Sequence, residues 1–109
     1  MTEQKTFTLE EARALLPWLK EVSAHADHQM TLIQKDSAEV AAAKQSEIIQ
    51  HWAETIFKLG ALPKQPFTVD FDSGSDFYCW EYPEEDIYYR HDYHMGYLGR
   101  RPIDPSISQ

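Results

Sequence analysis

The sequence predicts an α+β fold, in which a long antiparallel helical hairpin is followed by a small three-stranded antiparallel meander and a C-terminal loop. Across residues 9–59, apolar residues recur at three- and four-residue steps, which is the spacing of one helix face. After Pro66 the spacing changes to strict alternation, which is typical of a strand. The 109 residues suit a single domain, with the hairpin over 7–60, the meander over 67–91 and the loop and tail over 92–109.

The first helix is predicted over residues 9–34. Thr8 is a good N-cap, and Glu11 completes a capping box with it, so the helix should begin directly after Thr8. Pro17 lies inside the apolar run, but the spacing continues in phase beyond it. We therefore interpret Pro17 as a kink in one helix. The apolar face consists of Leu9, Ala12, Leu16, Leu19, Ser23, Ala26, Met30 and Ile33.

The second helix is predicted over residues 37–59. The segment 36–39 repeats the capping-box spacing, and Gly60 supplies a left-handed C-terminal cap. One continuous helix of roughly 50 residues is the alternative, but it would leave its apolar stripe uncovered unless another chain supplied the partner. We therefore favour a hairpin with Leu16, Leu19, Ile49, Trp52 and Ile56 between its helices. The stripe of the second helix is Ala38, Ala42, Gln45, Ile49, Trp52, Ile56 and Leu59.

Three strands are predicted, over residues 67–71, 77–82 and 87–91. In the first of them Val69 and Phe71 should point to one face, and Thr68 and Asp70 to the other. The strands are separated by turn-forming residues at 72–75 and 83–85. The segment from Asp92 onwards contains Gly96, Gly99, Pro102 and Pro105, and is expected to be a loop.

The charge and the cysteine content exclude several classes of partner. The net charge is −8, and residues 70–92 carry eight acids against a single base, Arg90. Because nucleic acids and anionic membranes are bound mainly through Lys and Arg, neither partner is expected. Cys79 is the only cysteine, the N-terminus is polar, and no apolar run approaches the ~20 residues of a membrane span. We therefore expect a cytoplasmic protein.

Both ends of the sequence carry motifs that resemble a known family. Residues 7–17 read F-T-L-E-E-A-R-A-L-L-P, and the tail follows the pattern W…H-[DE]…G-[FY]-x-G-R-x-P. On these motifs the chain resembles a group of small prokaryotic proteins known as domain-of-unknown-function family 2203. The resemblance covers nearly the whole chain, implies a single-domain prokaryotic protein, and brings no activity with it. The tail pattern corresponds here to Trp80, His91, Asp92, Gly96, Tyr97, Gly99, Arg100 and Pro102.

The tail motif supplies the candidate ligand-binding residues. Its glycines expose backbone amides, and a guanidinium beside them can hold a carboxylate or phosphate. The alternative is an internal latch, in which Arg100 or Arg101 pairs with Asp92 or another acid of the strands. The two interpretations are nearly balanced, with the latch slightly favoured. The candidate residues are Trp80, His91, Asp92, Gly96, Gly99 and Arg100.

The sequence does not specify a metal or catalytic site. His91 and His94 are the best available ligands, but in strand geometry His91 and its neighbour Asp92 point to opposite faces. Cys79, within an acidic and aromatic strand, is expected to be a core residue and not a nucleophile. We predict no cofactor and no metal, and identify no catalytic residues. The helical histidines His25, His28 and His51 are expected to face solvent.

Two functions remain open. The favoured one is an interaction or regulatory module that self-associates through its helices, as a homodimer or higher oligomer. Trp18, His25 and Leu32 form a second series on the first helix, about 120° from its main stripe, which indicates a second partner. The alternative is a small-anion- or metal-binding protein, or an enzyme, that uses residues 91–101. No second ionisable cluster in the helices supports that alternative.

Overall fold

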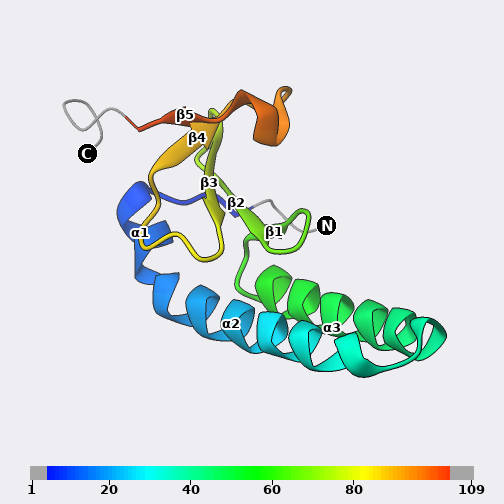
Figure 1. Ribbon diagram of the computed structural model, residues 1–109. Helices are drawn as coiled ribbons and strands as arrows, with labels where there is room; N and C mark the ends of the chain where they lie inside the picture. The colour runs from blue at the N-terminus through cyan, green and yellow to red at the C-terminus, as the bar shows by residue number, and fades with distance from the viewer. Residues whose placement is uncertain (1–4, 104–109) are drawn as a thin grey trace.

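In the computed structural model, which describes residues 5–103, a helical hairpin lies beneath a five-stranded antiparallel sheet (Figure 1). The α+β class and the order of helices followed by sheet are as predicted. The helices are α1 (Leu9–Ala14), α2 (Leu16–Leu32), the 3₁₀ helix η1 (Ile33–Lys35), α3 (Ala38–Lys58) and the 3₁₀ helix η2 (Gly96–Gly99). The strands are β1 (Leu62–Pro63), β2 (Thr68–Asp72), β3 (Phe77–Glu81), β4 (Tyr89–His91) and β5 (Arg101–Pro102), in the spatial order β1-β2-β3-β4-β5.

The chain begins α1 as predicted, but the kink expected at Pro17 is wrong. The Thr8 hydroxyl accepts the Glu11 amide at 3.0 Å, and the Glu11 carboxylate accepts the Thr8 amide at 2.9 Å, which completes the capping box. Instead of bending, the helix ends at Ala14, and α2 starts at Leu16. Pro17 then lies in the first turn of α2, where its missing amide hydrogen would have no helical partner.

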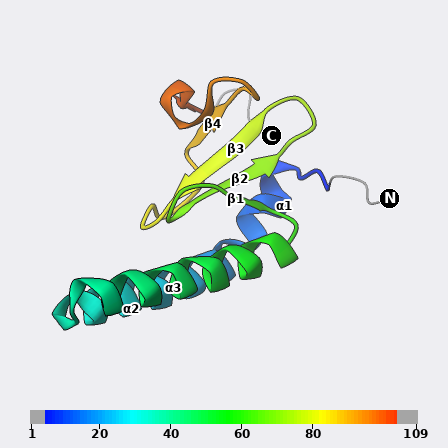
Figure 2. The same ribbon diagram turned by 90° about the vertical axis from the view of Figure 1, so that its right-hand side faces the viewer.

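Helices α2 and α3 form an antiparallel hairpin within one chain, so the single-rod alternative does not apply (Figures 1 and 2). The Ser37 hydroxyl caps α3 by accepting the Val40 amide at 3.3 Å. Gly60 follows the end of α3 with a φ of 92°, as the predicted cap requires. Inside the hairpin, Trp52 Nε1 donates to Ser23 Oγ at 2.9 Å.

The apolar stripe of the hairpin is buried only near the sheet. The hairpin extends well beyond the sheet in both views, and its far end has no layer above it (Figure 2). Consequently Ala38, Ala42 and Gln45, which were assigned to the stripe, are exposed. Of the residues predicted to lie between the helices, Ile49 is half-buried, while Leu16, Leu19, Trp52 and Ile56 are buried.

The predicted meander corresponds to β2, β3 and β4, but the sheet has five strands and not three. Strands β1 and β5 consist of two residues each, which is too short for an alternating pattern to be visible in the sequence. Strand β5 lies within the segment expected to be a loop. The prolines at 63 and 102 are tolerated because both strands are at the edges of the sheet.

The two faces of the sheet have different chemistry. Val69, Phe71 and Trp80 belong to the apolar core that includes the helices. Thr68 and Asp70 point to the opposite face, as the alternation predicted. The centre of this second face is also buried, and the tail, residues 92–100, lies against it. Tyr93 packs edge-on against Phe77 with 4.8 Å between ring centroids.

Candidate functional site

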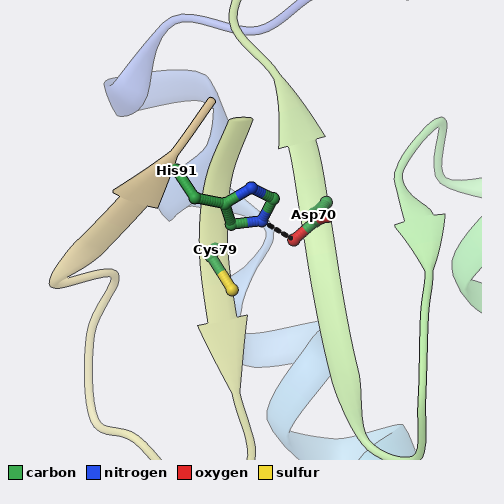
Figure 3. A group of neighbouring side chains, drawn as sticks. All are labelled: Asp70, Cys79 and His91. Carbon is green, nitrogen blue, oxygen red and sulfur yellow. Dashed lines mark hydrogen bonds and ion pairs between the residues drawn. The ribbon is translucent and has the colours of Figure 1, made fainter. Parts of the chain in front are cut away.

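Three side chains with metal-ligand chemistry converge on the sheet face that the tail covers. Asp70 comes from β2, Cys79 from β3 and His91 from β4 (Figure 3). Asp70 and Cys79 are opposite each other in the register, and His91 is opposite Phe77, two residues before Cys79. The potential ligand atoms of the three all lie within 4.8 Å of one another. Their residues are no more than 2% exposed. We call these three residues the buried triad.

The hydrogen bonds of His91 define which of its ring nitrogens carries the hydrogen. His91 Nδ1 donates to the Asp92 carbonyl oxygen at 2.8 Å, and because a carbonyl can only accept, the ring hydrogen lies on Nδ1. His91 Nε2 lies 3.1 Å from Asp70 Oδ1. A neutral ring would direct a lone pair at the carboxylate. A hydrogen bond between Nε2 and Oδ1 therefore needs a proton between the two atoms, a position that a metal ion can also occupy.

The thiol of the buried triad is protonated when no metal is bound. Burial raises the pKa of Cys79 to about 12, the negative charge of Asp70 adds to this shift, and Arg100 opposes it. Such a thiol is not a nucleophile at neutral pH, and Cys79 is buried as predicted. A bound metal cation is the usual means by which a buried cysteine is converted to its thiolate.

A cavity of about 180 Å³ opens beside the buried triad. Thr68 lines it, and the Thr68 hydroxyl is buried without a hydrogen-bond partner anywhere in residues 5–103. Buried polar groups are nearly always hydrogen-bonded, and a water or another polar molecule in the cavity would satisfy this hydroxyl. Besides the triad and Thr68, the lining consists of Lys64, Gln65, Phe77, Tyr93, Gly96 and Tyr97.

Arg100 forms an internal latch with Glu84 and, at 3.8 Å, with Glu81 of β3, and not with Asp92. Arg100 Nη2 donates to both carboxylate oxygens of Glu84 at 2.8 Å. Its guanidinium stacks 4.1 Å from the Tyr89 ring centroid. Burial is the largest single influence and acts to lower the pKa of Arg100. The bond to Glu84 and the negative charges around the guanidinium together outweigh burial, so the pKa of Arg100 is raised. The guanidinium is thus neutralised within the chain.

The remaining polar and glycine residues of the tail motif shape the tail. Asp92 Oδ1 accepts the amides of Met95 at 2.7 Å and His94 at 3.0 Å, and these bonds lower the pKa of Asp92. Gly96 has a φ of 65°, which favours glycine. A side chain at Gly99 would place its Cβ in collision with that of Met95. These residues hold the tail over the sheet.

Of the six candidate ligand-binding residues, only His91 contributes a side chain to the cavity, and Gly96 lines it with backbone. Trp80 lies in the core on the other face, with Nε1 donating to the Glu84 carbonyl at 2.9 Å. His94 is exposed and lies outside the buried triad. Asp70 and Cys79 were not predicted as site residues, although the polar alternation of Thr68 and Asp70 in a strand was a usable signal. The helical histidines His25, His28 and His51 are exposed, as predicted.

Comparison with known proteins identifies the family. No significant match was found to a curated protein or to a solved structure. Within residues 5–103, no helix is both long and apolar enough to cross a membrane. The sequence matches the family described as "uncharacterized conserved protein (DUF2203)" over residues 5–103, a range that includes both motifs noted above. The chain therefore belongs to the DUF2203 family.

Proposed function

We propose that this protein binds a divalent transition metal ion, with zinc as the best fit, through Asp70, Cys79 and His91. The observation that carries the proposal is the clustering of a carboxylate, a thiol and an imidazole within 4.8 Å. Zinc accepts this set of ligands, and its bond lengths place ligand atoms roughly 3.3–3.8 Å apart in a tetrahedral site. Small side-chain rotations are enough to close the triad around an ion.

The charge of the buried triad supports the proposal. Without metal, the triad holds one proton on the thiol and one shared between His91 and Asp70. Exchanging these two protons for one divalent ion leaves the net charge of the buried group unchanged. The exchange therefore avoids burying an uncompensated charge, which would be costly. The bond from His91 Nδ1 to a backbone carbonyl is the outer contact that commonly orients a metal-binding histidine.

The number of ligands indicates the type of metal site. Structural zinc sites are usually closed by four protein ligands, whereas sites with three leave a position for water or a ligand. Among the described residues, the triad supplies three ligands, and the cavity lies beside them. We therefore propose an open site that can exchange a small molecule.

Cobalt titration tests the metal site. We expect the wild-type protein to bind Co²⁺ with a thiolate-to-cobalt charge-transfer band, and Zn²⁺ to displace it. Cys79→Ser should abolish the band. Asp70→Asn and His91→Gln each remove a direct ligand, so they should weaken the affinity for Co²⁺ by more than roughly 10–100-fold, which is the usual cost of losing an outer-shell partner. His94→Gln is the matched control, because His94 is exposed and lies outside the triad, and it should bind like wild type.

Thermal melts with and without zinc keep the test independent of folding defects. A metal that binds only the folded state raises its stability by about 2.7 kcal/mol at a free concentration of 100 Kd. Wild type and His94→Gln should show this rise, and a folded Cys79→Ser should not. A wild-type protein without a cobalt band would show that a proton, and no metal, lies between His91 and Asp70.

Self-association through the hairpin is a second candidate function. It is supported by large apolar side chains that are exposed along the hairpin. Trp18 is 62% exposed and Phe57 67%, and Leu32 and Val40 are also exposed. Trp18 borders a shallow groove with Leu59. The partner we propose is a second copy of the chain, for which the charges are suitable. Residues 16–58 carry four bases and six acids, so two hairpins repel less than two acidic sheets.

Light scattering on a size-exclusion peak tests self-association. We expect a mass above the 12.7 kDa of one chain at tens of micromolar. Trp18→Lys should reduce the mass to that of the monomer. Leu98→Lys is the matched control, since Leu98 is 93% exposed but lies in the tail. A wild-type monomer at this concentration would contradict the proposal.

A further inference from the structure

On the basis of the proposed metal site, we infer that the cavity beside it binds a small organic monoanion. Its carboxylate would bridge the open metal position and the ammonium group of Lys64. Its short apolar body would lie against the aromatic rings of the lining. The inference rests on the charge of the cavity, on one unpartnered hydroxyl and on the orientation of two tyrosines.

The charge of the loaded cavity favours an anion. A divalent ion bound by one carboxylate and one thiolate is neutral, so the remaining charge comes from Lys64, the one cation among the described residues that line the cavity. Lys64 has no ion pair with any residue from 5 to 103. Its Nζ lies 5.7 Å from the centroid of Phe77, which is another lining residue. Lys64 therefore supplies the one positive charge on the described lining, from a solvent-exposed side chain.

Arg100 cannot supply this charge. Its guanidinium is bonded to both oxygens of Glu84, and its side chain is only 12% exposed. Arg100, the cation that the tail motif suggested for anion binding, is therefore not available. Lys64, which precedes β2, takes this role. The backbone amide of Lys64 donates to the Thr68 carbonyl at 2.9 Å, and this bond holds Lys64 close to the cavity.

Thr68 provides an independent indication of a ligand. It is 2% exposed, it lines the cavity, and its hydroxyl oxygen is buried with no partner in the described part of the chain. A carboxylate oxygen beside the metal position would accept a hydrogen bond from this hydroxyl. The bond would satisfy a group that otherwise costs stability.

The aromatic lining indicates that the ligand has an apolar body. Tyr93 donates its hydroxyl to Asp72 at 2.7 Å, and Tyr97 donates its hydroxyl to Glu81 at 2.8 Å. Because both hydroxyls are bonded outside the lining, the tyrosines contribute mainly ring surface to it. A volume of about 180 Å³ suits a short-chain carboxylate.

Titration of the cobalt-loaded protein with butanoate tests the inference, with the neutral butanamide as control ligand. We expect butanoate to shift the cobalt spectrum at concentrations where butanamide does not. Lys64→Met removes the charge but keeps the apolar stem, and should weaken butanoate about tenfold while cobalt affinity stays within about threefold. Lys58→Met is the matched control, because Lys58 is exposed at the end of α3 and away from the cavity, and it should behave like wild type.

The outcomes separate this inference from the metal proposal. If cobalt binds but butanoate leaves its spectrum unchanged, or if butanamide acts equally well, the anion site is wrong and the metal site stands. If Lys64→Met binds butanoate as tightly as wild type, Lys64 has no role and the inference is overturned. If cobalt does not bind, the metal proposal fails, and the anion site fails with it.

Discussion

Arg100→Ala is expected to lower the free energy of unfolding by about 3 kcal/mol. The side chains of Arg100 and Glu84 are 12% and 20% exposed, so the substitution leaves a largely buried carboxylate without its cation. It also removes the guanidinium that stacks on Tyr89 and lies 4.9 Å from the Tyr97 ring centroid. The value is placed at the low end of the range for buried pairs because neither side chain is fully buried. Chemical denaturation followed by circular dichroism measures the change.

Arg101→Ala is the matched control for this prediction. Arg101 is the next residue, but its side chain is 56% exposed and lies 3.5 Å from Asp76, so its loss should cost about 0–1 kcal/mol. Arg100→Ala with Glu84→Gln completes a double-mutant cycle that isolates the pair. If Arg100→Ala is as mild as Arg101→Ala, the tail does not depend on the latch. Arg100 would then be available for a ligand, as the sequence also allowed.

Trp52→Ala is expected to cost about 3–5 kcal/mol, because it removes the largest buried side chain at the junction of hairpin and sheet. Trp52 is 1% exposed, and its ring packs edge-on against Phe67 at 5.1 Å between centroids. Its indole nitrogen also donates to Ser23, which is fully buried. The same denaturation experiment, performed at one fixed protein concentration, measures the loss.

Trp52→Phe separates the hydrogen bond from the packing. The phenyl ring keeps much of the contact but leaves the Ser23 hydroxyl without its donor, so we expect a loss of about 1–3 kcal/mol. A loss below about 1 kcal/mol for Trp52→Ala would mean that the hairpin and the sheet do not unfold as one cooperative unit. That result would contradict the single core described here.

Features that depend on a few neighbouring residues were predicted from the sequence. The helix start at Thr8 was predicted, because its side chain bonds to an amide three residues away. For α3 the cap is Ser37, one residue after Asp36, which the capping-box spacing had placed in that role. Gly60 ends the hairpin through its own backbone conformation. The break in the helix before Pro17 was not predicted. The interruption at Pro17 was recognised from the sequence. However, one kinked helix and two successive helices have the same sequence pattern, and they differ only in how the flanking turns pack.

The candidate site depended on long-range register. Alternation placed Asp70 opposite to Val69 within one strand, but a single strand does not specify which residues face it. Asp70 meets Cys79 only because β2 and β3 pair in one register, and His91 joins them through the pairing of β3 with β4. A shift of one residue in either pairing would separate the three side chains.

The local pattern thus determined the α+β class, the helix caps and the alternation of the strands, because each of these arises from contacts within one or two turns of the chain. The burial of the second sheet face, the pairing of Arg100 with Glu84, and the meeting of Asp70, Cys79 and His91 all required the folded chain. These features join residues 9–21 positions apart, or depend on the tail folding over the sheet. Their geometry follows from strand register and packing. A pattern of residue types along the chain does not contain the distances between residues on different strands.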